Sequence, residues 1–139
     1  MESLRTFLPR SPIVPAATAP THDLRGEVRG LLRSWSEAGA TWNESAGGQP
    51  WAQPGAQARD IDHSTWASAP RHIIAGGQWY GFDVTALAAS WVRNPGQNYG
   101  MILFAQAGDS AANVEVQFAS REHPDPALRP QLVITYGVP

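Results

Sequence analysis

Short stretches of alternating apolar and polar residues recur along the chain, separated by segments rich in Gly and Pro. Alternation with a period of two is typical of a β-strand with one buried face. It predicts strands over residues 3–8, 24–35, 72–75, 78–84, 114–118 and 132–136. The continuous apolar run Met101–Ala105, within residues 99–106, predicts a strand buried on both faces. Many short strands joined by turns favour an all-β, jelly-roll-like antiparallel sandwich.

Two segments carry a helical pattern. Residues 28–35 lose strict alternation around Leu31 and Leu32, so a helix is an alternative to a strand there. Thr85 can cap a short helix near residues 85–92, in which Leu87 and Trp91 lie four positions apart on one face.

Two other segments lack either periodicity. Residues 9–22 form a Pro-rich arm with little capacity for sheet hydrogen bonds. Residues 43–70 are predicted to be a long loop rich in Gly, Pro and Trp, and a loop of this length is usually functional or mobile. The length of 139 residues predicts one domain over residues 1–139.

Composition and charge exclude several function classes. The net charge of −2 and the pI near 6.0 give no electrostatic signal for nucleic acid. No segment approaches the ~20 apolar residues of a membrane-spanning helix, so no membrane insertion is predicted. The N-terminal residues lack the charged and apolar regions of a signal peptide. Without Cys there is neither a disulfide nor a thiolate metal site.

Several phrases in the chain occur together, in a fixed order, in one known family. They are residues 35–43 (WSEAGATWN), 82–91 (FDVTALAASW), 98–103 (NYGMIL), 118–122 (FASRE) and 129–136 (RPQLVITY). In this order they resemble the C-terminal part of the DNRLRE, or disaggregatase-related, domain, over roughly residues 3–137. The resemblance implies a β-sandwich of a secreted or cell-surface protein. It also implies kinship with jelly-roll carbohydrate-binding modules, among them alginate binders.

The first strands of that family have no counterpart before residues 4–8, so about the first third of the family pattern is expected to be absent. Removing strands from a sandwich leaves unpaired edges and uncovered apolar faces. Three alternatives follow from this: the chain is a fragment, a smaller sandwich closes without those strands, or neighbouring copies complete one another by strand exchange. The Pro-rich arm suits an exchanged segment.

Candidate metal ligands are few. Asp60 and Asp62 project to one side of an extended chain, and their oxygens suit a structural Ca²⁺; a solvated loop is the alternative. The four His residues share no ligand spacing, which disfavours zinc. No cofactor is predicted.

Catalysis is not predicted either, and no catalytic residue is assigned. The chain has no nucleophile elbow, P-loop or dinucleotide fingerprint. Carboxylates that a glycosidase would need in a pair are present, but each lies in a phrase with a structural interpretation: Glu37, Glu44, Asp83 and Glu122. Arg121 and Glu122 are predicted to form a structural polar pair, at least half-buried.

The aromatic residues suggest a binding site. Trp51, Trp66 and Tyr80 are candidates for a platform on which sugar rings stack, and Arg71 could contact acidic sugars. The alternative is that these rings pack the long loop. The remaining Trp residues are expected in the core or half-buried: Trp35, Trp79 and Trp91 in the core, Trp42 half-buried.

The sequence therefore predicts a non-catalytic extracellular module that binds polysaccharide or contributes to a cell-surface structure. The alternative is a self-assembling structural subunit of an extracellular fibre, whose partners are copies of itself.

Overall fold

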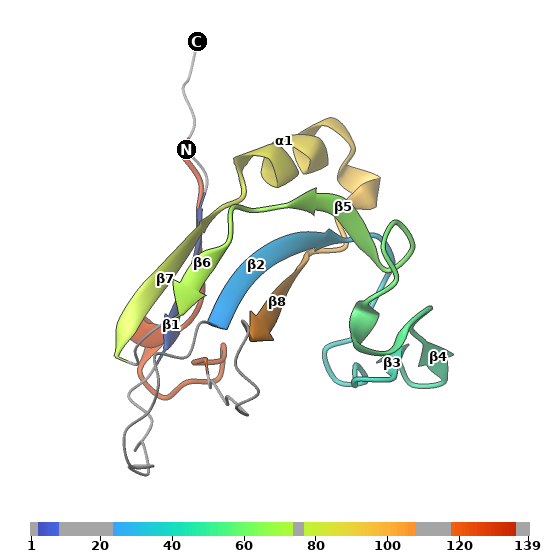
Figure 1. The fold of residues 1–139 in the computed structure, drawn as a ribbon, viewed down its shortest axis with the longest axis horizontal. Helices are drawn as coiled ribbons and strands as arrows, with labels where there is room; N and C mark the ends of the chain where they lie inside the picture. The colour runs from blue at the N-terminus through green and yellow to red at the C-terminus, as the bar shows by residue number, and fades with distance from the viewer. Residues whose placement is uncertain (1–2, 9–23, 74–76, 108–117, 136–139) are drawn as a thin grey trace. The chain divides into compact units, whose positions relative to one another are not determined.

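The computed structural model describes residues 3–8, 24–73, 77–107 and 118–135. Strands dominate these residues (Figure 1). The strands are β1 (Ser3–Leu8), β2 (Leu24–Leu31), β3 (Glu44–Ala46), β4 (Gln49–Pro50), β5 (His63–Ala67), β6 (Arg71–Ile73), β7 (Gln78–Asp83), β8 (Met101–Ala107) and β9 (Gln131–Val133). The helical elements are α1 (Thr85–Arg93) and three short 3₁₀ turns, η1 (Pro54–Ala56), η2 (Pro95–Gln97) and η3 (Pro126–Leu128).

The strand pairs confirm the predicted fold class. The pairs β1–β7, β1–β9, β2–β5, β2–β6 and β3–β4 are all antiparallel. The described residues hold one α-helix, at the position predicted for it. Antiparallel sheets with one short helix fit the predicted β-sandwich. The Pro-rich arm and the strand predicted over residues 114–118 lie outside the described residues, except for Phe118.

Residue contacts group the chain into two compact units. Unit 2 comprises residues 28–68 and 86–104, and unit 1 comprises the rest of the chain. Strand β2 begins in unit 1 and ends in unit 2. The prediction of a single domain stays a prediction.

Unit 1 contains a three-stranded sheet with the order β7–β1–β9. The register pairs Leu4 of β1 with Phe82 of β7. Along β7, Tyr80 and Phe82 are buried, whereas Trp79, which precedes them, is exposed. The burial of Tyr80 and Phe82 fits a strand with one buried face, but Trp79 is exposed, so the prediction that it lies in the core was wrong.

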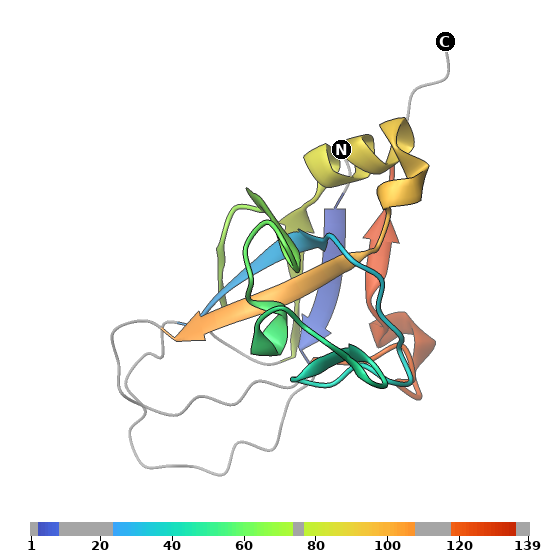
Figure 2. The same cartoon turned by 90° about the vertical axis from the view of Figure 1, so that its right-hand side faces the viewer.

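Unit 2 is organised around the second half of β2. The buried positions of this strand alternate at residues 24, 26, 28 and 30, and Leu31, its last residue, is also buried. Residues 28–31 therefore belong to a strand, and the helical alternative for residues 28–35 was wrong. Backbone N–H groups of β2 donate to the hydroxyls of one serine within β5 and one directly after it: Gly30 N to Ser64 Oγ at 3.2 Å and Val28 N to Ser68 Oγ at 2.9 Å. Strand β8 pairs with β2 on the side away from β5 (Figure 2).

Helix α1 begins at Thr85, whose N–H donates to the Asp83 carboxylate at 2.9 Å. Hydrogen bonds from Thr85 lower the pKa of Asp83. Thr85 is thus the first helical residue and not the cap predicted for it, and the carboxylate of Asp83 accepts the capping hydrogen bond instead. Leu87 is buried, as the helical spacing predicted, but Trp91 is only half-buried. None of the described helices has the length and apolarity needed to cross a membrane.

Residues 43–70 are not simply a loop, contrary to the prediction. They contain the β3–β4 hairpin, the turn η1 and strand β5. Sequence periodicity missed these elements because β3 and β4 are too short to show alternation and β5 is irregular where it pairs with β2. The apolar run in β8 also differs from its prediction, since Met101–Phe104 are half-buried.

We predict that Gly30→Ala destabilises the protein. A Cβ at position 30 would lie 2.6 Å from Cδ1 of Leu87, which is itself buried, so the absence of a side chain lets α1 approach β2 within unit 2. Overpacking of this kind costs about 1–3 kcal/mol, measurable by urea unfolding. Gly96→Ala is the matched control, because a Cβ there meets nothing within 4 Å. Equal stability of the two variants would contradict the close packing.

Candidate functional site

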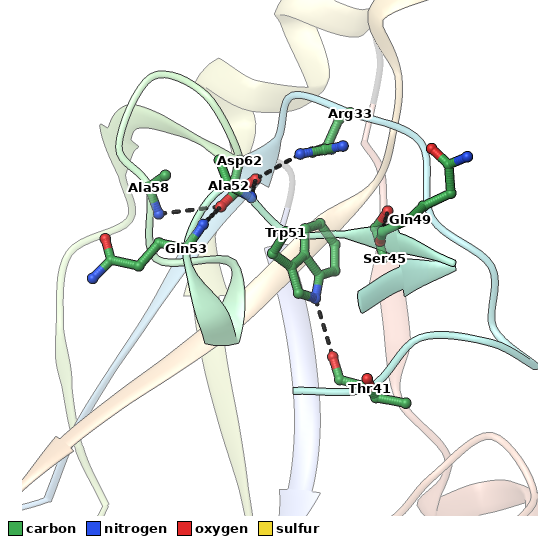
Figure 3. Close-up of polar contacts among 9 residues, drawn as sticks. All are labelled: Arg33, Thr41, Ser45, Gln49, Trp51, Ala52, Gln53, Ala58 and Asp62. Atoms are coloured by element: carbon green, nitrogen blue, oxygen red, sulfur yellow. Dashed lines mark hydrogen bonds and ion pairs between the residues drawn. The ribbon is translucent and has the colours of Figure 1, made fainter. Parts of the chain in front are cut away.

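Asp62 is a fully buried carboxylate at the centre of a hydrogen-bond network in unit 2 (Figure 3). Oδ1 accepts the N–H of Ala52 at 2.9 Å, and Oδ2 accepts those of Gln53 at 3.0 Å and Ala58 at 3.3 Å. Arg33 completes the set with an ion pair to Oδ1 at 3.2 Å. A buried charge is tolerated when its oxygens are filled in this way.

The pKa of Asp62 reflects these opposing effects. Burial alone raises it, but the hydrogen bonds from the three backbone N–H groups and from Arg33 together lower it below its ordinary value of 3.8. The carboxylate is therefore ionised at neutral pH and fastens residues 52–58 to the start of β5.

Trp51 directly precedes the segment that Asp62 holds, and its ring is only 9% exposed. It forms a small core with Leu31 and Ala56, against which Tyr99 and Ile102 pack. Its indole Nε1 donates to the carbonyl of Thr41 at 3.0 Å (Figure 3), and its backbone N–H donates to the carbonyl of Asn43, also at 3.0 Å. Trp51 thus fixes the main chain on both sides of residue 42.

A pocket of about 320 Å³ opens elsewhere in unit 2, among β2, β5, α1 and the segment after η2. Its aromatic lining consists of Trp66, Trp91 and Tyr99. The hydroxyls of Ser64 and Ser90 in the lining donate to the carbonyls of Trp66 and Leu87. The exposed Gln97 contributes an amide at the pocket. The pocket is therefore largely apolar with a few polar groups, the composition usual for small-molecule sites.

A comparison with protein families identifies this architecture. The family described as carbohydrate-binding module family 96 matches residues 14–136, which is most of the chain. The chain belongs to carbohydrate-binding module family 96. No match was found among the curated proteins. Membership in family 96 confirms the part of the sequence-based prediction that concerned a carbohydrate-binding module.

The four residues predicted to bind the ligand do not gather in one unit of this family 96 module. Trp51 and Trp66 belong to unit 2, whereas Arg71 and Tyr80 belong to unit 1. The rings of Trp51 and Tyr80 are buried, at 9% and 7% exposure, which corrects the expectation that they offer open faces. Trp66 is half-buried in the pocket lining. Arg71 is exposed, and its Nε donates to the carbonyl of Gly81 at 3.0 Å.

The predicted metal and polar sites have local structural roles. Asp60 accepts a hydrogen bond from the hydroxyl of Thr65, while the oxygens of Asp62 face N–H donors. Among the described residues, no three His, Asp or Glu side chains are grouped as metal ligands. Nε of Arg121 lies 2.8 Å from Oε1 of Glu122, but the side chains are 70% and 76% exposed, so the burial expected for this pair was wrong. An exposed pair contributes little stability.

Two of the other candidate carboxylates also make local contacts. Glu44 Oε2 accepts the N–H of Gly48 at 3.3 Å, inside the β3–β4 hairpin. Asp83 holds the first turn of α1. Both contacts match the structural interpretation that the sequence suggested for these residues.

Sequence reasoning missed the central role of Asp62, the pocket residues Trp91 and Tyr99, and the anchoring role of Arg33. One signal was available: Asp62 is one of few side-chain acceptors near a long run of Ala, Gly and Gln residues. Backbone donors in such a run need acceptors when the segment packs.

We predict that Asp62→Asn lowers the free energy of unfolding by about 3 kcal/mol at pH 7, because it removes a buried charge on which four donors converge. Since the folded-state pKa is depressed, the carboxylate stabilises fully above the unfolded-state value of about 3.9. This contribution is lost as the pH falls through the folded-state pKa. The difference between variant and native chain should therefore shrink at pH 2, as measured by urea unfolding.

The exposed neighbour provides the control for this variant. Asp60→Asn should cost about 1 kcal/mol or less, because that carboxylate is exposed. A stability loss for Asp62→Asn that is the same at pH 7 and pH 2 would show that its charge is not what holds the segment.

Proposed function

We propose that the chain is a non-catalytic module that binds polysaccharide in the aromatic-lined pocket of unit 2. The pocket is the observation that carries this proposal. Its volume of about 320 Å³ lies at the lower end of the ~300–1,000 Å³ typical of ligand sites. Its lining places three aromatic side chains, Trp66, Trp91 and Tyr99, around one hollow in a chain of family 96.

The lining chemistry suits a sugar ring. The C–H faces of a pyranose are apolar and pack against indole and phenol rings, while its hydroxyls need polar partners at the edges. Gln97 can supply such a partner with both a donor and an acceptor. A sugar that uses both kinds of contact is held in one orientation.

The sequence-predicted residues enter this proposal in different ways. Trp66 keeps a direct ligand contact, since it lines the pocket. Trp51 packs in the core of unit 2, and Tyr80 lies on the buried face of β7. Arg71 is proposed to contact acidic sugars from unit 1 with its exposed guanidinium.

The setting of the module follows from the resemblance of its phrases to the DNRLRE family. We infer an extracellular or cell-surface location, where polysaccharides are the abundant ligand. Membership in a family of carbohydrate-binding modules supports this location.

We predict that Trp66→Ala weakens polysaccharide binding about tenfold or more, as expected when a central aromatic contact is removed. Affinity electrophoresis through gels containing neutral or acidic polysaccharides measures the change as lost retardation. Trp79→Ala is the matched control, because Trp79 is an exposed tryptophan of unit 1. Unchanged retardation of Trp66→Ala in every gel that retards the native chain would refute the pocket assignment.

A second candidate function is self-assembly with copies of the chain. It is favoured by β9, which lies at one edge of the described β7–β1–β9 sheet. Leu132 and Val133 in β9, and Ile134 after it, are exposed. An apolar edge strand is a template for pairing with another chain.

Strand pairing of this kind predicts particles that grow with protein concentration, followed by light scattering and negative-stain imaging without any ligand. Leu132→Lys places a charge on the edge strand and should keep the chain monomeric. A native chain that remains monomeric throughout the concentration series would exclude this function.

A further inference from the structure

Trp42 is the most exposed tryptophan of the chain, at 64%. Large aromatic rings are usually mostly buried, and the sequence predicted that Trp42 is half-buried. Trp42 is not among the residues that line the pocket. Its exposure therefore needs an explanation separate from the pocket.

The ring is also held in place. Gly55 lies directly against its benzo edge, so that a Cβ at position 55 would come within 2.5 to 2.8 Å of Cη2, Cζ3 and Cζ2 of Trp42. The N–H of Gly55 donates to the carbonyl of Trp42 at 2.5 Å. Gly55 has φ of +76°, a conformation that favours glycine.

The main chain around Trp42 is fixed as well. Trp51 bonds to the carbonyls of Thr41 and Asn43, as described above, and the N–H of Thr41 donates to the carbonyl of Glu44 at 2.8 Å. Three consecutive carbonyls, at residues 41, 42 and 43, are thus each occupied. An exposed ring that is ordered before binding loses little conformational entropy when a ligand stacks on it.

The surroundings of Trp42 point to the class of ligand. In residues 36–58, which carry the ring and its supports, the charged residues are Glu37 and Glu44, both acidic. The exposed polar residues closest in sequence to Trp42 and Gly55 are neutral, namely Thr41, Asn43 and Gln53. Carboxylates next to a site disfavour a polyanion, whereas hydroxyl and amide groups suit the hydroxyls of a neutral sugar.

We propose that Trp42 is a second sugar-stacking position, separate from the pocket, and that it takes an uncharged polysaccharide. The proposal rests on the proposed function, in that the chain binds polysaccharide at all. Gly55 and Trp51 are positioning residues for this ring, and the neutral side chains around it bond to hydroxyls of the stacked sugar.

The test is ¹⁹F NMR of the whole chain labelled with 5-fluorotryptophan. The chain has six tryptophans, and single Trp→Phe variants assign their signals. The probes are a soluble neutral glucan, a galactomannan, alginate and polygalacturonate. We expect at least one neutral polymer to shift the Trp42 signal, and neither acidic polymer to do so.

The signals of Trp42 and Trp66 separate the two proposals. A neutral polymer that shifts Trp66 but leaves Trp42 in place overturns the second position and leaves the proposed function standing. If none of the four polymers shifts either signal, both proposals fail. A Trp42 signal that responds to alginate or polygalacturonate, but to neither neutral polymer, overturns the ligand class.

Variants test the geometry of the ring. Trp42→Ala should weaken binding of the responding neutral polymer about tenfold, whereas Trp42→Tyr, which keeps an aromatic face, should retain most of it. Gly55→Ala keeps the indole but displaces it, so it should also weaken binding. Ile61→Ala, which removes an exposed aliphatic side chain from the same unit, is the control and should bind as the native chain does.

Two results in this series would count against the proposal. Wild-type affinity of Trp42→Ala would show that the ring makes no contact. Wild-type affinity of Gly55→Ala would show that its fixed position is irrelevant. The ¹⁹F signals of the other tryptophans report in each case whether the variant has kept its fold.

Discussion

The buried carboxylate of Asp62 is the interaction on which unit 2 depends. An ionised carboxylate inside a protein has to be surrounded by donors. Here the donors come from distant points of the chain: the side chain of Arg33, shortly after β2, and the backbone N–H groups of residues 52, 53 and 58. A segment with few apolar side chains is thereby held by polar contacts. The remaining support comes from Trp51, whose ring packs on Leu31. Together these two residues replace the extended core that so short a segment cannot build.

This arrangement reverses the burial that the sequence suggested for Trp51, expected as an open platform, and for Trp42, expected to be half-buried. Trp51 and Trp42 stand nine positions apart in similar turn-rich surroundings, and composition does not distinguish them. In the structure the first is a core residue and the second an exposed one, because the hydrogen bonds of Trp51 to Thr41 and Asn43 turn one ring inward and leave the other outside.

The regular elements were predictable because their pattern is local. Strands β2 and β7 and helix α1 follow from apolar spacing within each segment, and the order of phrases implied a family of sandwich folds. The candidate site was less predictable, since it depends on contacts between residues far apart in sequence. Nothing in the sequence near Asp62 shows that its partners are the N–H groups of Ala52 and Gln53, and nothing near Gly30 shows that Leu87 packs on it. For the predicted platform of Trp51, Trp66, Tyr80 and Arg71, composition likewise did not show that Trp51 and Tyr80 are buried or that the four residues belong to two units.

The main-chain anchoring of residues 41–43 has a further consequence for how such modules diversify. Since the anchors are main-chain carbonyl and N–H groups and the indole of Trp51, the side chains of Asn43 and Gln53 take no part in holding the loop through any of the hydrogen bonds described. Natural drift or directed evolution can replace these amides without disturbing the backbone that carries the ring. The backbone of the loop then stays constant while its exposed side chains vary. Closely related chains can therefore acquire different sugar preferences through a few substitutions at the surface.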